Sequence, residues 1–128
     1  MRKKKTPDLL TSVELELMTT LWLLGKGTVR DVVDHESNVG NRAYTSVATV
    51  MKILEQKGFV SSEKQDRWLV YRPSVSKSDY QLRSLKDISR TLFESTPSAL
   101  VARLVDDEDL TDEMIEDIRA MLDARTAK

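Results

Sequence analysis

The stretch from residue 43 to residue 72 constrains the fold of this chain most. Its first part has apolar residues at spacings of three and four, which predicts a helix that begins at Ala43 or Tyr44 and ends at Gln56. Two short runs of β-type residues follow, at 59–63 and 68–72, and the polar residues 64–67 between them predict a hairpin. The apolar face of the helix consists of Val47, Val50, Met51 and Leu54.

Two further helices precede this stretch. Thr11 and Glu14 have the spacing of a capping box, so we expect a helix that starts there and ends at Gly25. A short helix follows with Thr28 as its N-cap and Asp31 at its third position, and it fades within the turn-rich residues 35–41. The order of helix, helix, helix and hairpin predicts a winged helix-turn-helix, mainly α with a small β-hairpin wing. The residues expected to face its core are Val13, Leu17, Met18, Leu21 and Leu24 in the first helix and Val29, Val32 and Val33 in the second.

From residue 76 onward the pattern is helical only. We expect one helix over residues 79–93, a second from Thr96-Pro97 and a third with Thr111 as its N-cap. Three short amphipathic helices cannot bury their apolar faces alone, so they are expected to pack on an identical chain. We therefore divide the chain into a basic tail (1–7), a DNA-binding domain (8–75) and a helical dimerisation segment (76–128). The predicted dimer contacts are Leu82, Leu85, Ile88, Leu92, Leu100, Val101, Leu104, Ile115, Ile118 and Leu122.

Composition excludes several classes of protein. The chain has no cysteine, which excludes disulfides and thiolate metal sites and favours a cytoplasmic location. No apolar run approaches the roughly 18 residues of a membrane span, so no membrane partner is expected. Residues 1–75 contain 12 Lys and Arg against 9 Asp and Glu, whereas residues 76–128 contain 8 against 12. The first part is therefore the one suited to approach phosphate.

The outer face of the helix over residues 44–56 suits the major groove, because it carries short polar side chains near its N-terminus. Thr45, Ser46 and Thr49 can contact base edges or phosphates, and Lys52 can pair with phosphate or guanine. An ordinary solvated helix face is the alternative interpretation. The other candidate DNA contacts are Thr28, Arg42 just before the helix, and Lys64 and Arg67 in the hairpin turn. The negative charge of Asp66 in the same turn counts against a strong phosphate contact.

Nothing in the sequence indicates catalysis. His35 is the only histidine, and the acidic residues 106–109 lack the spacing and glycine of a calcium loop, so neither predicts a metal site. Ser12 and Ser46 have no adjacent histidine to serve as a base, and there is no glycine-rich phosphate loop. We expect no enzyme activity, no metal and no cofactor.

Three stretches of the chain resemble the penicillinase-repressor group of winged-helix regulators, the BlaI/MecI/CopY family. Residues 10–22 contain the pattern E-x-x-x-M-x-x-x-W, residues 43–60 resemble the recognition helix and its exit, and residues 70–73 resemble the end of the wing. The resemblance implies a homodimer, held by its C-terminal helices, that binds a palindromic double-stranded operator and represses transcription. It also implies that Tyr44, Thr45, Ser46, Thr49 and Lys52 lie at the DNA. The family usually has a basic residue where this chain has Ile53.

The resemblance also bears on how repression ends. In the antibiotic-responsive members a protease cuts within the dimerisation segment, and the matching bond here joins Arg103 and Leu104. Those members have Asn-Phe at this bond, so cleavage of this chain by such a protease does not follow. A regulatory protease or a sensor protein is nevertheless a possible partner. The copper-responsive members carry paired cysteines that this chain lacks.

Two other functions compete with DNA-binding repression. Many winged helices serve as protein-interaction modules without contacting DNA, and the net charge of −1 favours that alternative. An enzyme is the more distant alternative, since it would need a pocket with paired titratable groups.

Overall fold

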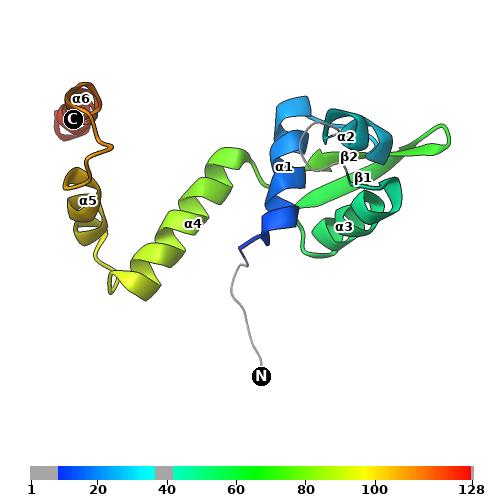
Figure 1. Cartoon of the computed structure of the whole chain (residues 1–128), viewed down its shortest axis with the longest axis horizontal. Coiled ribbons are helices and arrows are strands. Elements are labelled where there is room, and N and C mark those ends of the chain that lie inside the picture. Colours follow the sequence, from blue (N-terminus) through cyan, green and yellow to red (C-terminus); the bar gives the residue numbers. More distant parts are fainter. Residues whose placement is uncertain (1–8, 37–41, 128) are drawn as a thin grey trace. The chain divides into compact units, whose positions relative to one another are not determined.

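The computed structural model describes residues 9–36 and 42–127 and confirms the predicted fold class (Figure 1). A two-stranded antiparallel sheet follows three helices, and three more helices complete the chain. The chain divides into two compact units, the first ending at Ser84 and the second beginning at Leu85. The elements are α1 (Ser12–Leu24), α2 (Val29–Glu36), α3 (Tyr44–Gln56), β1 (Val60–Gln65), β2 (Trp68–Pro73), α4 (Lys77–Leu92), α5 (Pro97–Val105) and α6 (Asp112–Thr126).

Helix α1 begins with the capping box that its sequence predicts. The Glu14 backbone N–H donates to the Thr11 hydroxyl at 3.2 Å, and the Thr11 backbone N–H donates to the Glu14 carboxylate at 2.9 Å. These two bonds satisfy amides that a helix leaves without partners in its first turn. The helix ends at Gly25, whose φ of 87° suits a residue without a Cβ.

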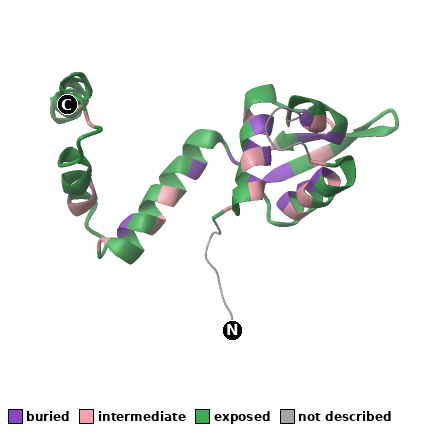
Figure 2. Ribbon diagram, in the orientation of Figure 1, coloured by how far each residue is buried: buried purple, intermediate pink, exposed green. Residues whose placement is uncertain are grey.

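The core of the first unit lies between the three N-terminal helices and the sheet (Figure 2). The predicted apolar faces of α2 and α3 are confirmed, because Val29 and Val32 are buried and Val33 and Val50 pack against the core. The expectation for Leu24 is wrong, since its side chain is 38% exposed and lies beside Gly27 in the turn after α1. The fully buried aliphatic side chains are Leu17, Met18, Leu21, Val32, Val47, Met51 and Leu54.

The hairpin is longer than its sequence predicts. Strands β1 and β2 pair in register from Val60 opposite Pro73 to Gln65 opposite Trp68, which leaves only Asp66 and Arg67 in the turn. Asp66 has a φ of 58°, in the left-handed region that aspartate tolerates better than most residues. Lys64 therefore lies in β1, opposite Leu69, and not in the turn.

The first turns of α4 belong to the first unit. Tyr80 is buried in its core, 5.9 Å from the rings of both Trp22 and Phe59, and its hydroxyl accepts a hydrogen bond from the Leu10 backbone N–H at 2.8 Å. Trp22 Nε1 donates to the Val75 carbonyl, also at 2.8 Å. The compact unit thus extends past residue 75, where we predict the boundary between the DNA-binding and dimerisation functions; that functional boundary stays a prediction.

The second unit consists of the rest of α4 with α5 and α6. No residue of α5 or α6 is buried among those that the structure describes, and Figure 2 shows both helices without purple. Thr111 caps α6, because its hydroxyl accepts from the Met114 backbone N–H at 3.2 Å. In the two described ranges, no helix combines the length and the apolar character of a membrane span.

Candidate nucleic-acid interface

The outer face of α3 carries the predicted reading residues. Thr45, Ser46, Thr49 and Lys52 are all exposed, because Val47 and the other apolar side chains of the helix face the core. The Thr49 hydroxyl donates to the Thr45 carbonyl at 3.0 Å, so it can only accept a hydrogen bond from a ligand or present its methyl group. The face combines acceptors, hydroxyl donors and one cation, a set that can contact base edges and phosphates.

The two ends of α3 differ in their local capping. At the C-terminal end, the Phe59 and Gly58 backbone N–H groups donate to the Leu54 and Glu55 carbonyls at 2.9 and 3.0 Å, and Gly58 has a φ of 87°. No side chain of the described residues caps the N-terminus of α3 at Ala43, and its first turn contains no acidic residue. No acidic side chain within this turn therefore offsets the positive end of the helix dipole. This end of α3 is electrostatically suited to a nearby anion.

Long-range ion pairs also join residues at both ends of α3 to α1. Arg42, just before the helix, places Nη1 2.6 Å from Glu16 Oε1. Lys57, the C-cap residue, places Nζ 2.9 and 2.8 Å from the two carboxylate oxygens of Glu14. Burial raises the pKa of Glu14, but the hydrogen bonds from Lys57 and Thr11 and the charge of Lys57 outweigh it, so the pKa lies below its ordinary value.

The pairing of Arg42 was not foreseen from the sequence. We predicted Arg42 as a phosphate contact, yet its guanidinium is engaged by Glu16 and its side chain is only 23% exposed. A phosphate contact by Arg42 would have to compete with this carboxylate. No sequence pattern indicates the pair, because the two residues are 26 positions apart.

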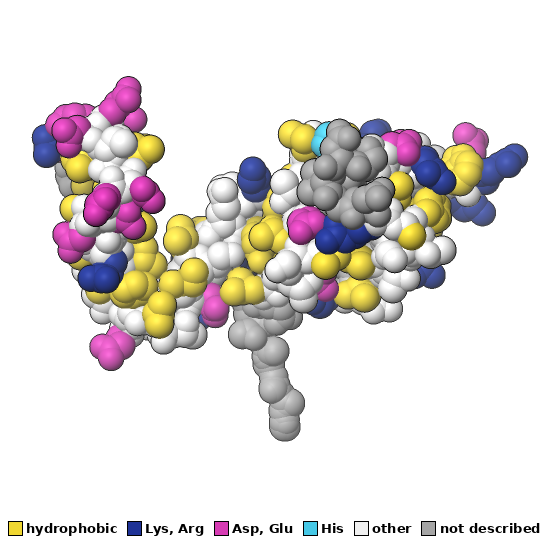
Figure 3. Space-filling view, viewed as in Figure 1, with side chains coloured by type: hydrophobic (Ala, Val, Ile, Leu, Met, Phe, Trp, Pro, Cys, Tyr) yellow, Lys and Arg dark blue, Asp and Glu magenta, His cyan; other side chains and the backbone are white. Residues whose placement is uncertain are grey.

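The end of the hairpin carries the predicted cations, Lys64 in β1 and Arg67 in the turn. Figure 3 shows basic side chains gathered at the end of the hairpin, beside an acidic one. Lys64 and Arg67 are exposed, and neither forms an ion pair with any residue in the described ranges. Asp66 lies between them in sequence, at the tip. Two unpaired cations at the end of a projecting hairpin suit contacts with a sugar-phosphate backbone.

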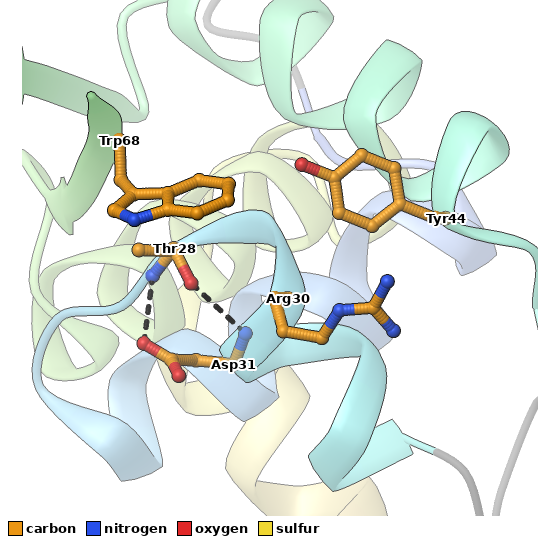
Figure 4. Close-up of a pocket in the computed structure, with 5 residues that line it drawn as sticks. All are labelled: Thr28, Arg30, Asp31, Tyr44 and Trp68. Atoms are coloured by element: carbon orange, nitrogen blue, oxygen red, sulfur yellow. Dashed lines mark hydrogen bonds between the residues drawn. The ribbon is translucent and has the colours of Figure 1, made fainter.

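A hollow of about 440 Å³ lies where the starts of α2, α3 and β2 meet (Figure 4). Thr28 and Asp31 form a reciprocal cap on one side, with bonds of 2.9 and 3.1 Å between backbone amides and side-chain oxygens. Tyr44 and Trp68 flank the hollow, and the Arg30 guanidinium carbon is 5.0 Å from the centre of the Tyr44 ring. The predicted contacts Thr28 and Tyr44 therefore line one surface.

Arg30 and Trp68 are the residues of this surface that the sequence reasoning missed. Trp68 is 53% exposed, an unusual exposure for a tryptophan in a small domain and a sign of an interaction surface. The position of Trp68 directly after the hairpin turn indicates this exposure in the sequence, because a large aromatic residue there lies far from the core. Arg30, one residue past the start of α2, carried no distinguishing pattern.

The second unit exposes most of the predicted dimer contacts. Leu92 is 72% exposed, and Leu104, in the last turn of α5 next to Arg103, is 54% exposed. Leu100, Ile115 and Ile118 are half-buried. The other exposed apolar residues of the predicted set are Leu82, Leu85, Ile88, Val101 and Leu122. Three further apolar residues that the sequence does not predict as dimer contacts are also exposed, namely Val105, Met114 and Met121.

A model of the penicillinase repressor family matches residues 10–124, which cover both units. The chain belongs to the penicillinase repressor family. Its members are transcriptional repressors, so the family resemblance of the three sequence stretches is confirmed. Membership also assigns the helix-helix-helix-hairpin unit to the winged-helix class.

Characterised members of the penicillinase repressor family match along almost their whole length. The methicillin resistance regulatory protein MecI of Staphylococcus aureus (strain N315) is 22% identical over 116 residues, which cover 91% of this chain and 94% of MecI. The penicillinase repressor of Bacillus licheniformis is 25% identical over 121 residues, or 94% of this chain and 93% of that protein.

Two solved structures of family members match the N-terminal part. The solution structure of the DNA-binding domain of the repressor BlaI has a TM-score of 0.52 and 28% identity, and covers 61% of this chain and 94% of that domain. The monomeric form of BlaI from B. licheniformis, in complex with the blaP half-operator, has a TM-score of 0.50 and 26% identity. The match covers 60% of this chain and 94% of that BlaI chain.

Proposed function

We propose that this chain is a dimeric, sequence-specific DNA-binding repressor that occupies a palindromic operator and inserts α3 into the major groove. The observation that carries the proposal is the outer face of α3. Thr45, Ser46 and Thr49 are exposed on a helix whose first turn contains no acidic residue, and no acid lies on that face before Glu55. Such a face tolerates the negative potential of a groove.

The elements next to α3 support the same docking. The exposed cations Lys64 and Arg67 at the end of the hairpin match phosphates that flank a groove. Thr28, Tyr44 and Trp68 border the hollow at the N-terminal end of α3, where the backbone of a docked duplex would pass. The half-operator bound by the related BlaI supports one chain per half-site. Family membership favours this function over a protein-interaction module that does not contact DNA.

The second unit supports a homodimer. Helices α5 and α6 bury none of their described residues, although both carry apolar residues at helical spacing. Leu92, Val101, Leu104 and Leu122 are all exposed, and clustered apolar residues exposed on short helices are typical of an interaction surface. A second copy of the same three helices is the simplest partner that covers these residues.

Comparing the affinity of the full chain for two DNAs tests the proposal. One duplex is the region upstream of its own gene, and the other is a scrambled duplex of equal length and composition. We expect the first to bind at least about 1,000-fold more tightly at physiological salt. Equal affinities for the two duplexes would refute sequence-specific binding. Complete failure to bind either duplex would favour the interaction module.

A further inference from the structure

Helix α3 differs from α1, α2 and α6 in how its N-terminal end is fixed. Those three helices begin with a side-chain cap, supplied by Thr11, Thr28 and Thr111. Helix α3 has no side-chain cap within the described residues and no basic residue in its last turn. Its ends are tied to α1 by residues 26 and 43 positions apart in the chain.

The two carboxylates of α1 lie on opposite flanks of that helix. Glu14 and Glu16 are two positions apart, and at about 100° per residue their side chains leave α1 about 200° apart. Glu14 receives Lys57 from the C-terminal end of α3, and Glu16 receives Arg42 from its N-terminal end. Helix α3 is therefore held at both ends against one short segment of α1.

The apolar contact between the two helices does not fix their angle by itself. Leu17, Leu21, Val47 and Met51 are fully buried in the same core, but apolar burial is non-directional and tolerates small rotations. Ion pairs with short, defined geometry at two separate points restrict such a rotation. The Glu14 carboxylate is almost buried, with 7% of its side chain exposed, whereas 41% of the Glu16 side chain is exposed.

We propose that Glu14 and Glu16 are positioning residues for α3, which act through Lys57 and Arg42 to set the angle at which its outer face meets the bases. Operator discrimination then depends on two carboxylates that do not contact DNA. Arg42 forms its ion pair with Glu16 and does not contact a phosphate. The inference rests on the proposed function. A phosphate contact by Arg42 would raise the affinity for every DNA sequence, whereas positioning of α3 affects only the contacts with bases. The two roles of Arg42 therefore predict different binding results.

Glu16→Gln tests the inference with little risk to folding, because the Glu16 side chain is partly exposed. Affinities for operator and scrambled DNA are measured at several salt concentrations. Glu63→Gln is the matched control, since Glu63 also faces an arginine, Arg72, at 3.9 Å in the same unit, and its loss also removes one negative charge. Relative to this control, we expect Glu16→Gln to lower operator affinity about tenfold, comparable to the removal of one hydrogen-bonded base contact. Affinity for scrambled DNA and the salt slope are expected to match the control.

Three results would overturn the inference. The first is tighter binding of both duplexes with a salt slope steeper by about one, which would mean that Arg42 is released onto a phosphate. The second is an unchanged ratio of operator to scrambled affinity. The third is failure of the reversed pair, Glu16→Arg with Arg42→Glu, to restore that ratio, since the double variant keeps the net charge and the ion pair.

The unsubstituted chain separates this inference from the proposed function. If it does not distinguish its operator from scrambled DNA, both fall together. If it does and Glu16→Gln distinguishes them equally well, only the positioning role of Glu16 falls. Far-ultraviolet circular dichroism and thermal unfolding of each variant establish whether the compared proteins are folded. If Glu16→Gln is not folded, the reversed pair provides the decisive comparison.

Discussion

Lys57 donates from Nζ to both carboxylate oxygens of Glu14, at 2.9 and 2.8 Å, and so joins the C-terminal end of α3 to the first turn of α1. Glu14 also closes the capping box of α1 with Thr11. One carboxylate therefore fixes the start of one helix and the end of another. Only 7% of the Glu14 side chain is exposed, so the carboxylate itself is almost buried although Lys57 is 32% exposed.

Glu14→Gln is expected to destabilise the chain by about 1–3 kcal/mol at neutral pH, because it removes the charge from an almost buried carboxylate that accepts two hydrogen bonds from Lys57. The free energy of unfolding, measured in urea, tests this. Glu116→Gln is the control, since Glu116 forms an exposed pair with Arg119 and its loss should cost at most about 0.5 kcal/mol. Equal stabilities for the two variants would contradict a structural role for the Glu14 pair.

The same carboxylate makes stability depend on acid. The pKa of Glu14 is lower in the folded chain than its ordinary value of 4.5, so the unfolded chain takes up this proton first as pH falls. Its stabilising contribution is complete above that value and is lost as the pH falls below about 4.5 through the folded pKa. The stability difference between the parent and Glu14→Gln should therefore shrink in that range. A difference that stays constant down to pH 3 would contradict the assignment.

Ser46→Ala and Thr49→Ala are expected to relax sequence choice. Each removes a group from the exposed face of α3 without touching its buried side. We expect operator binding to weaken by about 1–3 kcal/mol for each base contact that is removed, with little change for scrambled DNA. Binding to a panel of singly substituted operators measures the change. Should both variants keep the full preference of the parent, α3 is not the reader.

Arg67→Ala is expected to weaken binding to all sequences alike. Its side chain lies at the hairpin turn without an ion-pair partner in the described residues, so it is free to neutralise a phosphate. The slope of log affinity against log salt should become shallower by about one. Lys64→Ala serves as the comparison, because Lys64 lies within β1, two residues before the turn. A loss confined to the operator would indicate base reading by the hairpin and contradict this role.

The helices follow from the sequence because their signals are local. Thr11 and Glu14 are three residues apart and form the predicted box, and the buried faces of α2 and α3 repeat at helical spacing. The ion pairs of Arg42 and Lys57 are not local, so no pattern in the chain predicts them. The sequence therefore predicts the exposed face of α3 but not the ion pairs at its two ends.

The hairpin and the hollow show the same limit. Residues 64–67 are all polar, and polarity alone does not distinguish a four-residue turn from the two-residue turn at Asp66 and Arg67. Trp68 and Tyr44 come from distant elements and meet at the hollow only through folding. Leu24 has the spacing of a core residue but follows the last turn that the core covers.

Removing part of the second unit tests the proposed dimer. A chain that ends at Arg103 lacks the exposed apolar residues of α6 together with Leu104 and Val105. We expect it to be monomeric by sedimentation equilibrium and to bind operator at least about 100-fold more weakly, because the two half-sites are no longer linked. A chain that ends at Arg125 is the control and should stay dimeric. A dimer that persists without residues 104–128 would contradict the proposed interface.

The most direct test of the central claim is a nuclease footprint of the full chain on the DNA upstream of its own gene. If paired copies of α3 read a palindromic operator, two protected segments should appear, related by two-fold symmetry and centred about one or two helical turns apart. Substituting the bases within either segment should abolish the pattern. Uniform protection without a defined segment, or the same protection on scrambled DNA, would contradict sequence-specific reading by α3.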